Sequence, residues 1–475
     1  MQVLVLLLLA AVMLADQGLG ASWSAGSIPP WLPPLVAFLP PVACVVLEYV
    51  LVRRTLRLAV GGSPASILRA GTRLRVLQWI VVGCSVVSLA GLGWLELVRA
   101  AIGDVVVLDE LLSILPALFL LAMLWWVQWP LERLLRESLL IRRLDEGLPV
   151  HPVPSAAGYV LWQFRTHLLL VLVPVLMILA LVESAELAVR LLRPGSGIAP
   201  VAAGAAGLLG IVLAPFTMRL AVGAVPLADG PVRRAMEQVL REAGVRVRDI
   251  LVWPTGTSML NGAVIGVFPA TRFVLLTDGL LELLSLDQVR AVMAHEAGHL
   301  RHRHLPWTAA MLFALVALVG QLVEWIVNPV FRLALETGAD PGRLQSAFEL
   351  VAVVVVLGVV FIGFGAVSRR LELQADAAAA RDLALGHHEG DRVTPEASAL
   401  VASALESVAR YNGMDPARHT WRHGSIRWRQ SRLARLVGRP IDDLPIDRQV
   451  RLLKAGTILV ILAISLAWFV GEAPA

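Results

Sequence analysis

Charged residues are scarce in this sequence. Only 16% of its 475 residues are charged, whereas 57% are hydrophobic, and the mean hydropathy is +0.74. A soluble protein of this length does not bury so large an apolar fraction. The composition therefore excludes an ordinary soluble enzyme and predicts a polytopic membrane protein.

Cysteine and lysine are almost absent. The two cysteines, Cys44 and Cys84, both lie in apolar segments, so neither a disulfide framework nor a cysteine-based metal site is expected. Lys454 is the single lysine, and arginine therefore carries the net charge of +5. In so apolar a chain we interpret the arginine excess as a signal of membrane topology and expect no nucleic-acid partner.

Apolar segments long enough to cross a bilayer recur along the chain. A membrane helix needs roughly 20 apolar residues, and the candidate segments are 3–15, 32–52, 75–98, 110–129, 167–190, 198–221, 306–328, 346–367 and 453–471. The first is short, but it lacks the basic residues that open a signal peptide. We expect it to be a retained first helix, and a cleaved signal peptide is the alternative.

The arginines also predict how the chain is oriented. Loops 53–75 and 130–165 are rich in arginine, whereas the alternate loops 16–31 and 99–109 contain only Arg99. Arginine-rich short loops stay in the cytoplasm. The same alternation predicts two further cytoplasmic segments, 222–305 and 368–452. We therefore expect a multi-pass protein of the cell membrane, of the bacterial inner-membrane type.

This reading predicts five parts of the chain. They are an N-terminal membrane domain of about six helices at 1–221, the first part of a catalytic domain at 222–305, a transmembrane hairpin at 306–367, the second part of the catalytic domain at 368–452, and a C-terminal transmembrane helix at 453–475.

The stretch His295-Glu296-Ala297-Gly298-His299 has the pattern H-E-x-x-H. On a helix this spacing places both histidines on one face, where their ring nitrogens can bind one metal ion. A zinc site of this kind needs a third protein ligand and keeps one position for water, from which Glu296 could take a proton. The run Ser285 to Gln288 is a capping box that predicts where this helix begins. Chance alone produces the motif in on the order of one such chain in a hundred.

A second polar pair lies beyond the predicted hairpin. Glu372 and Asp376 are one turn apart on a predicted helix, so Glu372 could be the third ligand while Asp376 orients a histidine ligand. The alternative is that both are surface carboxylates paired with Arg369 and Arg370. If Glu372 is not the ligand, His302 and His304 are the next candidates.

The segment before the motif predicts a small β-sheet. A helix from Pro231 to Gly244 precedes strand-like runs at 245–252, 258–268 and 273–276, and Thr277 caps a short helix that ends at Leu284. The exposed edge of such a sheet can bind a substrate peptide as an additional strand. Farther on, Thr394 caps another helix, and an arginine- and tryptophan-rich stretch follows at 419–429.

These features together resemble the HtpX-like and CAAX prenyl protease family of integral-membrane zinc metallopeptidases. Four motifs carry the resemblance over residues 225–435. They are Asn261-Gly262-Ala263, Thr277-Asp278-Gly279-Leu280-Leu281, the H-E-x-x-H motif, and Ser368-Arg369 to Asp376, which matches the family pattern S-R-x-x-E-x-x-A-D.

The resemblance implies a fold, a ligand set and a reaction. The fold would be mainly α, a polytopic α-helical membrane protein with a zincin-like (gluzincin) cytoplasmic domain that contains a small β-sheet. His295, His299 and Glu372 would bind one Zn²⁺ per chain, Glu296 would be the general base and acid, and Asp376 would support a zinc ligand. His423 and Arg429 match a family pair that steadies the oxyanion, although Gly424 stands where the family usually has proline. Asn261, Gly262 and Ala263 would pair with substrate.

The sequence therefore predicts a membrane-embedded zinc metalloendopeptidase, a hydrolase whose active site faces the cytoplasm. Its substrates would be peptides or membrane proteins, cleaved in quality control or regulated proteolysis. Its other partner would be the lipid bilayer around it. Two alternatives remain, a metallopeptidase-type sensor and signal transducer, and a catalytically inactive scaffold or transporter. The oligomeric state does not follow from the sequence.

Overall fold

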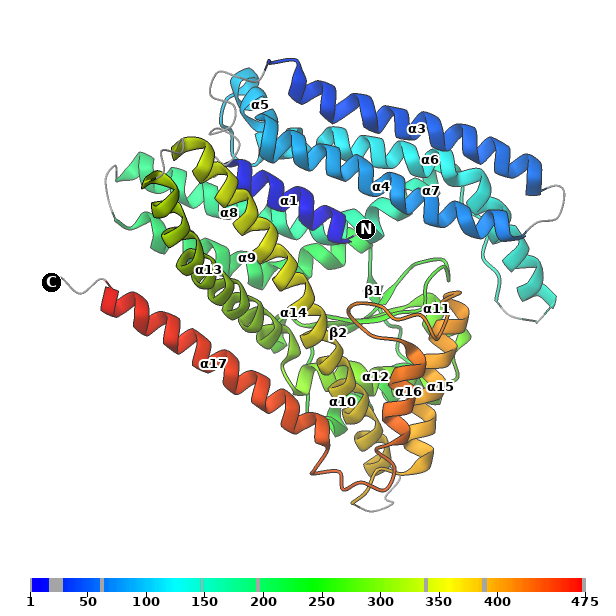
Figure 1. The fold of residues 1–475 in the computed structure, drawn as a ribbon. Coiled ribbons are helices and arrows are strands. Elements are labelled where there is room, and N and C mark those ends of the chain that lie inside the picture. The colour runs from blue at the N-terminus through cyan, green and yellow to red at the C-terminus, as the bar shows by residue number, and fades with distance from the viewer. Residues whose placement is uncertain are drawn as a thin grey trace. The chain divides into compact units, whose positions relative to one another are not determined.

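A computed structural model describes residues 2–16, 29–59, 64–145, 147, 149–193, 197–336, 341–386 and 391–471. The chain folds into two compact units, Met1–Ala224 and Val225–Ala475. Both units are rich in helices, and the strands all belong to the second (Figure 1).

The secondary-structure elements of the first unit's described part are all helices. Its helices are α1 (Gln2–Asp16), α3 (Leu32–Ala59), α4 (Pro64–Leu92), α5 (Trp94–Ile102), α6 (Leu108–Asp145), α7 (Ala156–Gln163), the π-helical turn η1 (Phe164–Leu169), α8 (Leu170–Leu192) and α9 (Ala199–Val222). Leucine, valine and alanine side chains from α1, α4 and α6 form its largest buried core. Continuous apolar stretches bounded by glycine, proline and charged residues favour such long helices.

Seven described helices are long and apolar enough to cross a membrane, five in the first unit and two in the second. They overlap seven of the nine predicted spans, and the predicted span 75–98 is interrupted at Gly93, between the end of α4 at Leu92 and the start of α5 at Trp94. The predicted span 3–15 forms a shorter apolar helix, Leu4–Asp16, and the predicted span 346–367 lies within α14, where many side chains are outside the described set. The chain is a polytopic α-helical membrane protein.

The prediction that residues 53–75 and 130–165 form loops is wrong for most of their length. Helix α3 continues to Ala59, α4 begins at Pro64, and α6 reaches Asp145. Arginine and leucine are good helix formers, so a helix that leaves the apolar layer has no local reason to end there. The basic residues therefore lie mainly on the polar ends of long helices.

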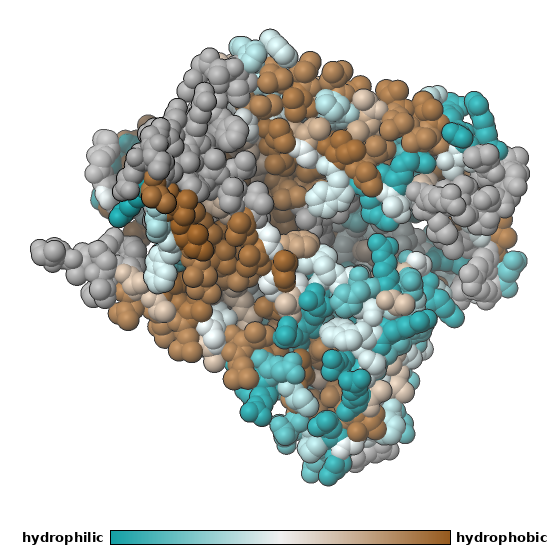
Figure 2. Space-filling view, in the orientation of Figure 1, coloured by the Kyte–Doolittle hydropathy of each residue, from teal (hydrophilic) through white to brown (hydrophobic). Residues whose placement is uncertain are grey.

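The second unit combines a small sheet with helices. Its elements are β1 (Val225–Pro226), α10 (Pro231–Glu242), β2 (Asp249–Trp253), β3 (Gly262–Ile265), η2 (Pro269–Thr271), β4 (Phe273–Thr277), α11 (Asp278–Leu283), α12 (Leu286–Arg301), α13 (His304–Glu336), α14 (Pro341–Gly386), α15 (Pro395–Tyr411), α16 (Ile426–Ala434) and α17 (Pro445–Gly471). Figure 2 shows hydrophobic residues over the described parts of α13 and α17 and hydrophilic residues over α15 and α16.

The sheet has the strand order β1-β2-β4-β3, with β2 parallel and β3 antiparallel to the fully buried β4. Two details of the predicted strands are wrong. Residues 245–248 are not a strand, because Gly244 in a left-handed conformation and the bond from the Val245 amide to the Leu240 carbonyl close the end of α10. The run 258–268 forms a strand only at β3. In this sheet β3 lies at the edge.

The helix caps follow the sequence signals. Ser285 and Gln288 form the reciprocal capping box at the start of α12, Thr277 caps α11, and Thr394 caps α15. These contacts fix where α12 begins, and therefore which of its faces carries the two histidines of the motif.

Small residues allow α12 to approach α14 closely. A Cβ atom at Gly298 would lie 3.1 Å from the Ala375 Cα and 3.1 Å from the Ala378 Cβ. The residues of α14 that face Gly298 are thus Ala375 and Ala378, and both are buried. Because the residues at this contact are small, α12 and α14 lie close together. Polar side chains of the two helices beside the contact can therefore reach one another.

Candidate metal centre

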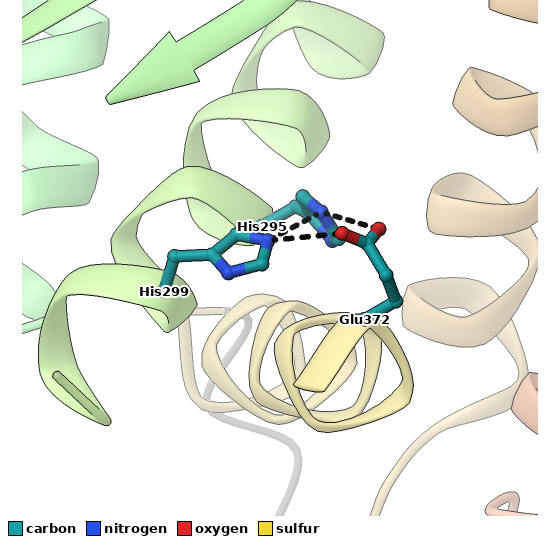
Figure 3. Close-up of side chains that lie close together, drawn as sticks. All are labelled: His295, His299 and Glu372. Atoms are coloured by element: carbon teal, nitrogen blue, oxygen red, sulfur yellow. Dashed lines mark hydrogen bonds and ion pairs between the residues drawn. The ribbon is translucent and has the colours of Figure 1, made fainter. Parts of the chain in front are cut away.

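His295 and His299 on α12 point toward Glu372 on α14 (Figure 3). The Nε2 atoms of the two histidines lie 3.2 Å apart. The Glu372 Oε2 atom is 3.7 Å from the His295 Nε2 atom, and the Oε1 atom is 3.8 Å from the His299 Nε2 atom. Two segments more than 70 residues apart in sequence thus place three potential donor groups around one point.

This donor set fits a tetrahedral zinc ion. Zinc–nitrogen and zinc–oxygen bonds of about 2.1 Å require donor atoms about 3.4 Å apart, and the three distances here are 3.2, 3.7 and 3.8 Å. Two imidazoles and a carboxylate leave one tetrahedral position for another ligand. Burial lowers the pKa of His299 well below its ordinary value, which favours the neutral ring that a metal requires.

Asp376 and Arg429 form a buried pair behind the histidines. The Asp376 Oδ1 atom lies 3.0 Å from the His295 Nδ1 atom, on the side of the ring away from Glu372. Arg429 donates from Nε and Nη2 to the two Asp376 oxygens at 2.8 and 2.6 Å. Burial would raise the pKa of Asp376, but the Arg429 charge and these hydrogen bonds lower it to about 2. Asp376 therefore stays ionised and can hold the His295 ring.

Arg429 also reaches the carboxylate of the donor set. Its Nη1 atom lies 3.4 Å from the Glu372 Oε2 atom, and its side chain is only 7% exposed. His423 lies on the other side, with its Nδ1 atom 3.0 Å from the Glu372 Oε1 atom and a side chain 49% exposed. Burial would raise the pKa of Glu372, but His423 and Arg429 lower it well below its ordinary value. Glu372 is therefore a carboxylate, as a metal ligand must be.

Glu296 lies beside the donor set without belonging to it. Its side chain packs against β3, where a Cβ atom at Gly262 would lie 3.2 Å from the Glu296 Oε1 atom. Burial, and then the charge of Glu372, raises the pKa of Glu296. A buried carboxylate with a raised pKa is suited to accept and return a proton. Gly262 leaves the space that this side chain occupies.

The three residues that were predicted to pair with substrate begin the edge strand. The Asn261 amide donates to the Thr277 hydroxyl at 3.0 Å, and Gly262 and Ala263 pair with β4. Asn412, at the end of α15, donates to and accepts from the Leu260 backbone at 2.8 and 2.9 Å. These contacts anchor the start of β3 beside Glu296.

The sequence pattern did not reveal a chain of hydrogen-bonding side chains behind His299. The His304 Nδ1 atom lies 2.7 Å from the His299 Nδ1 atom, and its Nε2 atom lies 2.9 Å from the Gln374 Oε1 atom. The Gln374 amide nitrogen in turn donates to the Asp447 carboxylate at 2.6 Å. His304 therefore contacts the outer side of His299, and it does not take the place of Glu372.

A cavity of about 770 Å³ opens beside these residues. Glu296, His299 and Glu372 line one part of it, and Val264 of the edge strand and Gly266, which follows that strand, line another. The cavity can therefore hold an extended chain next to both the donor set and a proton acceptor.

Known proteins resemble the second unit. Residues 226–407 match the family model described as Peptidase family M48. A protease HtpX homolog of Aeropyrum pernix is 37% identical over 92 residues, which are 19% of this chain and 28% of that protein. A homolog of Methanocaldococcus jannaschii is 28% identical over 143 residues, 30% of this chain and 49% of that protein. Protease HtpX of Pseudomonas paraeruginosa is 27% identical over 150 residues, 31% of this chain and 50% of that protein.

The chain thus spans half or less of the length of these relatives. Among solved structures, the crystal structure of S. mikatae Ste24p matches with a TM-score of 0.44 and 17% identity, and the match covers 85% of this chain and 99% of that one. The three converging side chains, His295, His299 and Glu372, lie within residues 226–407, the part of the chain that is similar to Peptidase family M48.

Proposed function

We propose that this protein is a zinc-dependent endopeptidase embedded in a membrane. One observation carries the proposal. His295, His299 and Glu372 converge within metal-binding distance of one another, next to the buried Glu296 and in a cavity that follows an edge strand. The set includes every group that peptide hydrolysis by this chemistry requires, which argues against an inactive scaffold or transporter. No described residue favours the sensor alternative.

The side chains have distinct proposed roles. A bound zinc ion would supply Lewis acidity, which lowers the pKa of water and polarises a carbonyl group. Glu296 accepts a proton at its carboxylate and returns it to the leaving amine. His423, which is half exposed and contacts Glu372, donates to the oxyanion of the substrate. Arg429 has two of its nitrogens engaged with Asp376, so we infer that it acts mainly by holding Asp376 and Glu372 ionised.

The substrate backbone pairs with the open edge of β3 beside Asn261, Gly262 and Ala263. Strand β3 uses one edge for β4 and has no other partner among the described strands, and backbone pairing binds peptides with little regard to sequence. We propose membrane proteins and their fragments as substrates, since the domain continues directly into membrane helices α13 and α14. Quality control or regulated proteolysis is the corresponding role.

The Glu296→Gln variant tests this function. It removes the proton acceptor but no metal ligand, so cleavage of casein by the purified full chain should fall by about 10²–10⁴-fold while the zinc content stays unchanged. A Glu242→Gln variant, changed on the surface of α10, is the matched control and should cleave normally. Undiminished cleavage by Glu296→Gln would reject the assignment of Glu296.

We also propose that the active site faces the cytoplasm, with residues 222–305 and 368–452 both on the cytoplasmic side and the parts 1–221, 306–367 and 453–475 within the cell membrane. The arginine-rich helix ends support this orientation. Ser63 and Ala339, which suit cysteine labelling by their sequence positions, lie outside the described residues, but Asp104 and Asp442 are exposed and described. In a chain without Cys44 and Cys84, cysteines at these two positions should react with an impermeant maleimide from opposite faces. Labelling of both from outside would reject the orientation.

A further inference from the structure

The cavity beside the candidate metal centre has a basic wall. We use this name for Arg246, Arg272 and Arg303, which line the cavity together with Val267 and Pro269. Arg301 and Arg422 line it as well, whereas the carboxylates among the described lining residues are those of Glu296 and Glu372. Five guanidinium groups in one cavity create a positive potential that attracts anionic groups.

Two arginines of the basic wall have no counter-charge among the described residues. Arg301 is paired with Asp382 at 2.7 Å, and Arg272 donates to the Val267 carbonyl and to the Arg246 carbonyl. In contrast, no carboxylate of a described residue lies within ion-pair distance of the Arg246 or Arg303 side chain, and both side chains are exposed. Burial and the nearby Arg303 charge lower the pKa of Arg272, as expected where like charges gather.

The basic wall lies at a defined distance along the edge strand. Gly262 is beside Glu296, and the chain then passes Val264, Gly266 and Val267 along the cavity until it reaches Arg272. An extended peptide that pairs with this strand advances about 3.3 Å per residue. Its residues four or five positions from the bond beside Glu296 therefore lie over the wall, roughly 13–17 Å away.

We propose that the basic wall binds an acidic side chain of the substrate, on the N-terminal side of the cleaved bond. This inference rests on the proposed function and adds a sequence preference to it. Antiparallel pairing, the more stable arrangement, aligns the start of β3 with the cleaved bond and the end of β3 with the preceding residues of the substrate. A carboxylate there neutralises the guanidinium groups of Arg246 and Arg303, which form no ion pair with a carboxylate of the described residues.

Peptide binding tests the wall separately from catalysis. The zinc-loaded Glu296→Gln protein, full length in detergent, is titrated with fluorescent extended peptides that are identical except for Glu, Gln or Lys at the acidic positions. Exposed ion pairs contribute modestly, so the Glu peptide should bind about three- to tenfold more tightly than the Gln peptide and the Lys peptide least tightly. Equal affinities would overturn the proposal, whether or not any peptide is cleaved by the wild-type protein.

Variants assign the preference to the wall. Arg246→Gln combined with Arg303→Gln should abolish the difference between the Glu and Gln peptides, and Arg303→Glu should favour the Lys peptide. Arg241→Gln, an exposed arginine of α10 that does not line the cavity, should keep the wild-type difference. Metal content and melting temperature of each variant show whether it is folded. A preference that survives in folded double variants would overturn the proposal.

Two further outcomes would contradict the proposal that the basic wall binds an acidic side chain of the substrate. In wild-type cleavage assays with the acidic residue moved along the peptide, the gain in kcat/KM should occur only before the cleaved bond. A gain only after that bond, or only from a free C-terminal carboxylate, would reject the proposed polarity. If the double variant instead loses binding to phosphatidylglycerol vesicles and peptides show no preference, the wall binds lipid head groups. Failure of wild-type cleavage with an intact binding preference would reject the proposed function alone.

Discussion

Each unit of this protein buries a cluster of charged groups, and the two clusters differ in what they leave open. In the first unit, Arg99 lies among three carboxylates, at 2.5 Å from Asp109 and at 2.9 Å from both Asp16 and Glu110. In the second unit, the donor atoms of His295, His299 and Glu372 face one another and lie within 4.8 Å of one another. In the first cluster the carboxylates surround the Arg99 guanidinium group. In the second cluster two imidazoles and a carboxylate surround a position that a metal ion could take.

The difference shows that buried charge alone does not identify a functional site. Arg99 provides the counter-charge that its carboxylates need and ties α1, α5 and α6 together. At the second cluster, Arg429 and His423 contact Glu372 from outside, and Asp376 and His304 contact the histidines from behind. These partners orient the donor atoms inward, and one cation of the right size completes the arrangement.

Replacing the arginine of either cluster, Arg99 or Arg429, should have the largest effect on stability. The two replacements should differ in their effect on zinc binding. Arg429→Met leaves Asp376 and Glu372 buried without their main counter-charge, which costs about 3–5 kcal/mol of stability. Arg99→Met should destabilise the first unit by less, because Arg99 is 25% exposed. Thermal unfolding in detergent measures both effects. Below its melting temperature the Arg429→Met protein should lose zinc, and the Arg99→Met protein should retain it.

The hydrogen-bonded side chains behind His299 predict a smaller effect that is confined to metal binding. Gln374→Leu removes the partner of the His304 Nε2 atom, so His304 no longer fixes the His299 ring. Zinc affinity should fall by roughly 10–100-fold, as is usual for groups that orient a ligand. Competition with a chromophoric chelator measures this, with Gln238→Leu on the surface of α10 as the control. An unchanged affinity would mean that the chain through Asp447 is only structural.

The smallest effect concerns two glycines at helix contacts. Gly298→Ala should cost about 1 kcal/mol and should weaken zinc binding slightly, because α12 and α14 must separate by a few tenths of an ångström. Gly210→Ala, whose new Cβ atom would lie 2.7 Å from the Ile178 Cγ1 atom, should destabilise the first unit without changing zinc affinity. If Gly298→Ala and Gly210→Ala changed zinc affinity equally, the claim that zinc binding depends only on the packing of the second unit would be contradicted.

Sequence spacing predicted which side chains lie together on one face of a helix. It did not predict contacts between side chains that are separated by the end of a helix. The intervals between His295 and His299 and between Glu372 and Asp376 place each pair on one helix face, and a metal centre follows if the two helices meet. The role of His304 was not predictable in this way, because α12 ends at Arg301 and a residue with positive φ, Arg303, precedes α13. Likewise, Gly298 and the alanines of α14 are visible as small residues, but only the structure shows that they face each other.

Zinc binding to matched glutamate variants tests the central claim most directly. The wild-type chain, Glu372→Ala and Glu110→Ala are each purified, stripped with a chelator and dialysed against Zn²⁺, and the bound metal is measured by mass spectrometry. The wild-type and Glu110→Ala proteins should each bind one zinc ion per chain, and Glu372→Ala should bind none tightly, since two histidines alone hold the ion weakly. Stoichiometric zinc of unchanged affinity in Glu372→Ala would contradict the claim that His295, His299 and Glu372 form the metal centre.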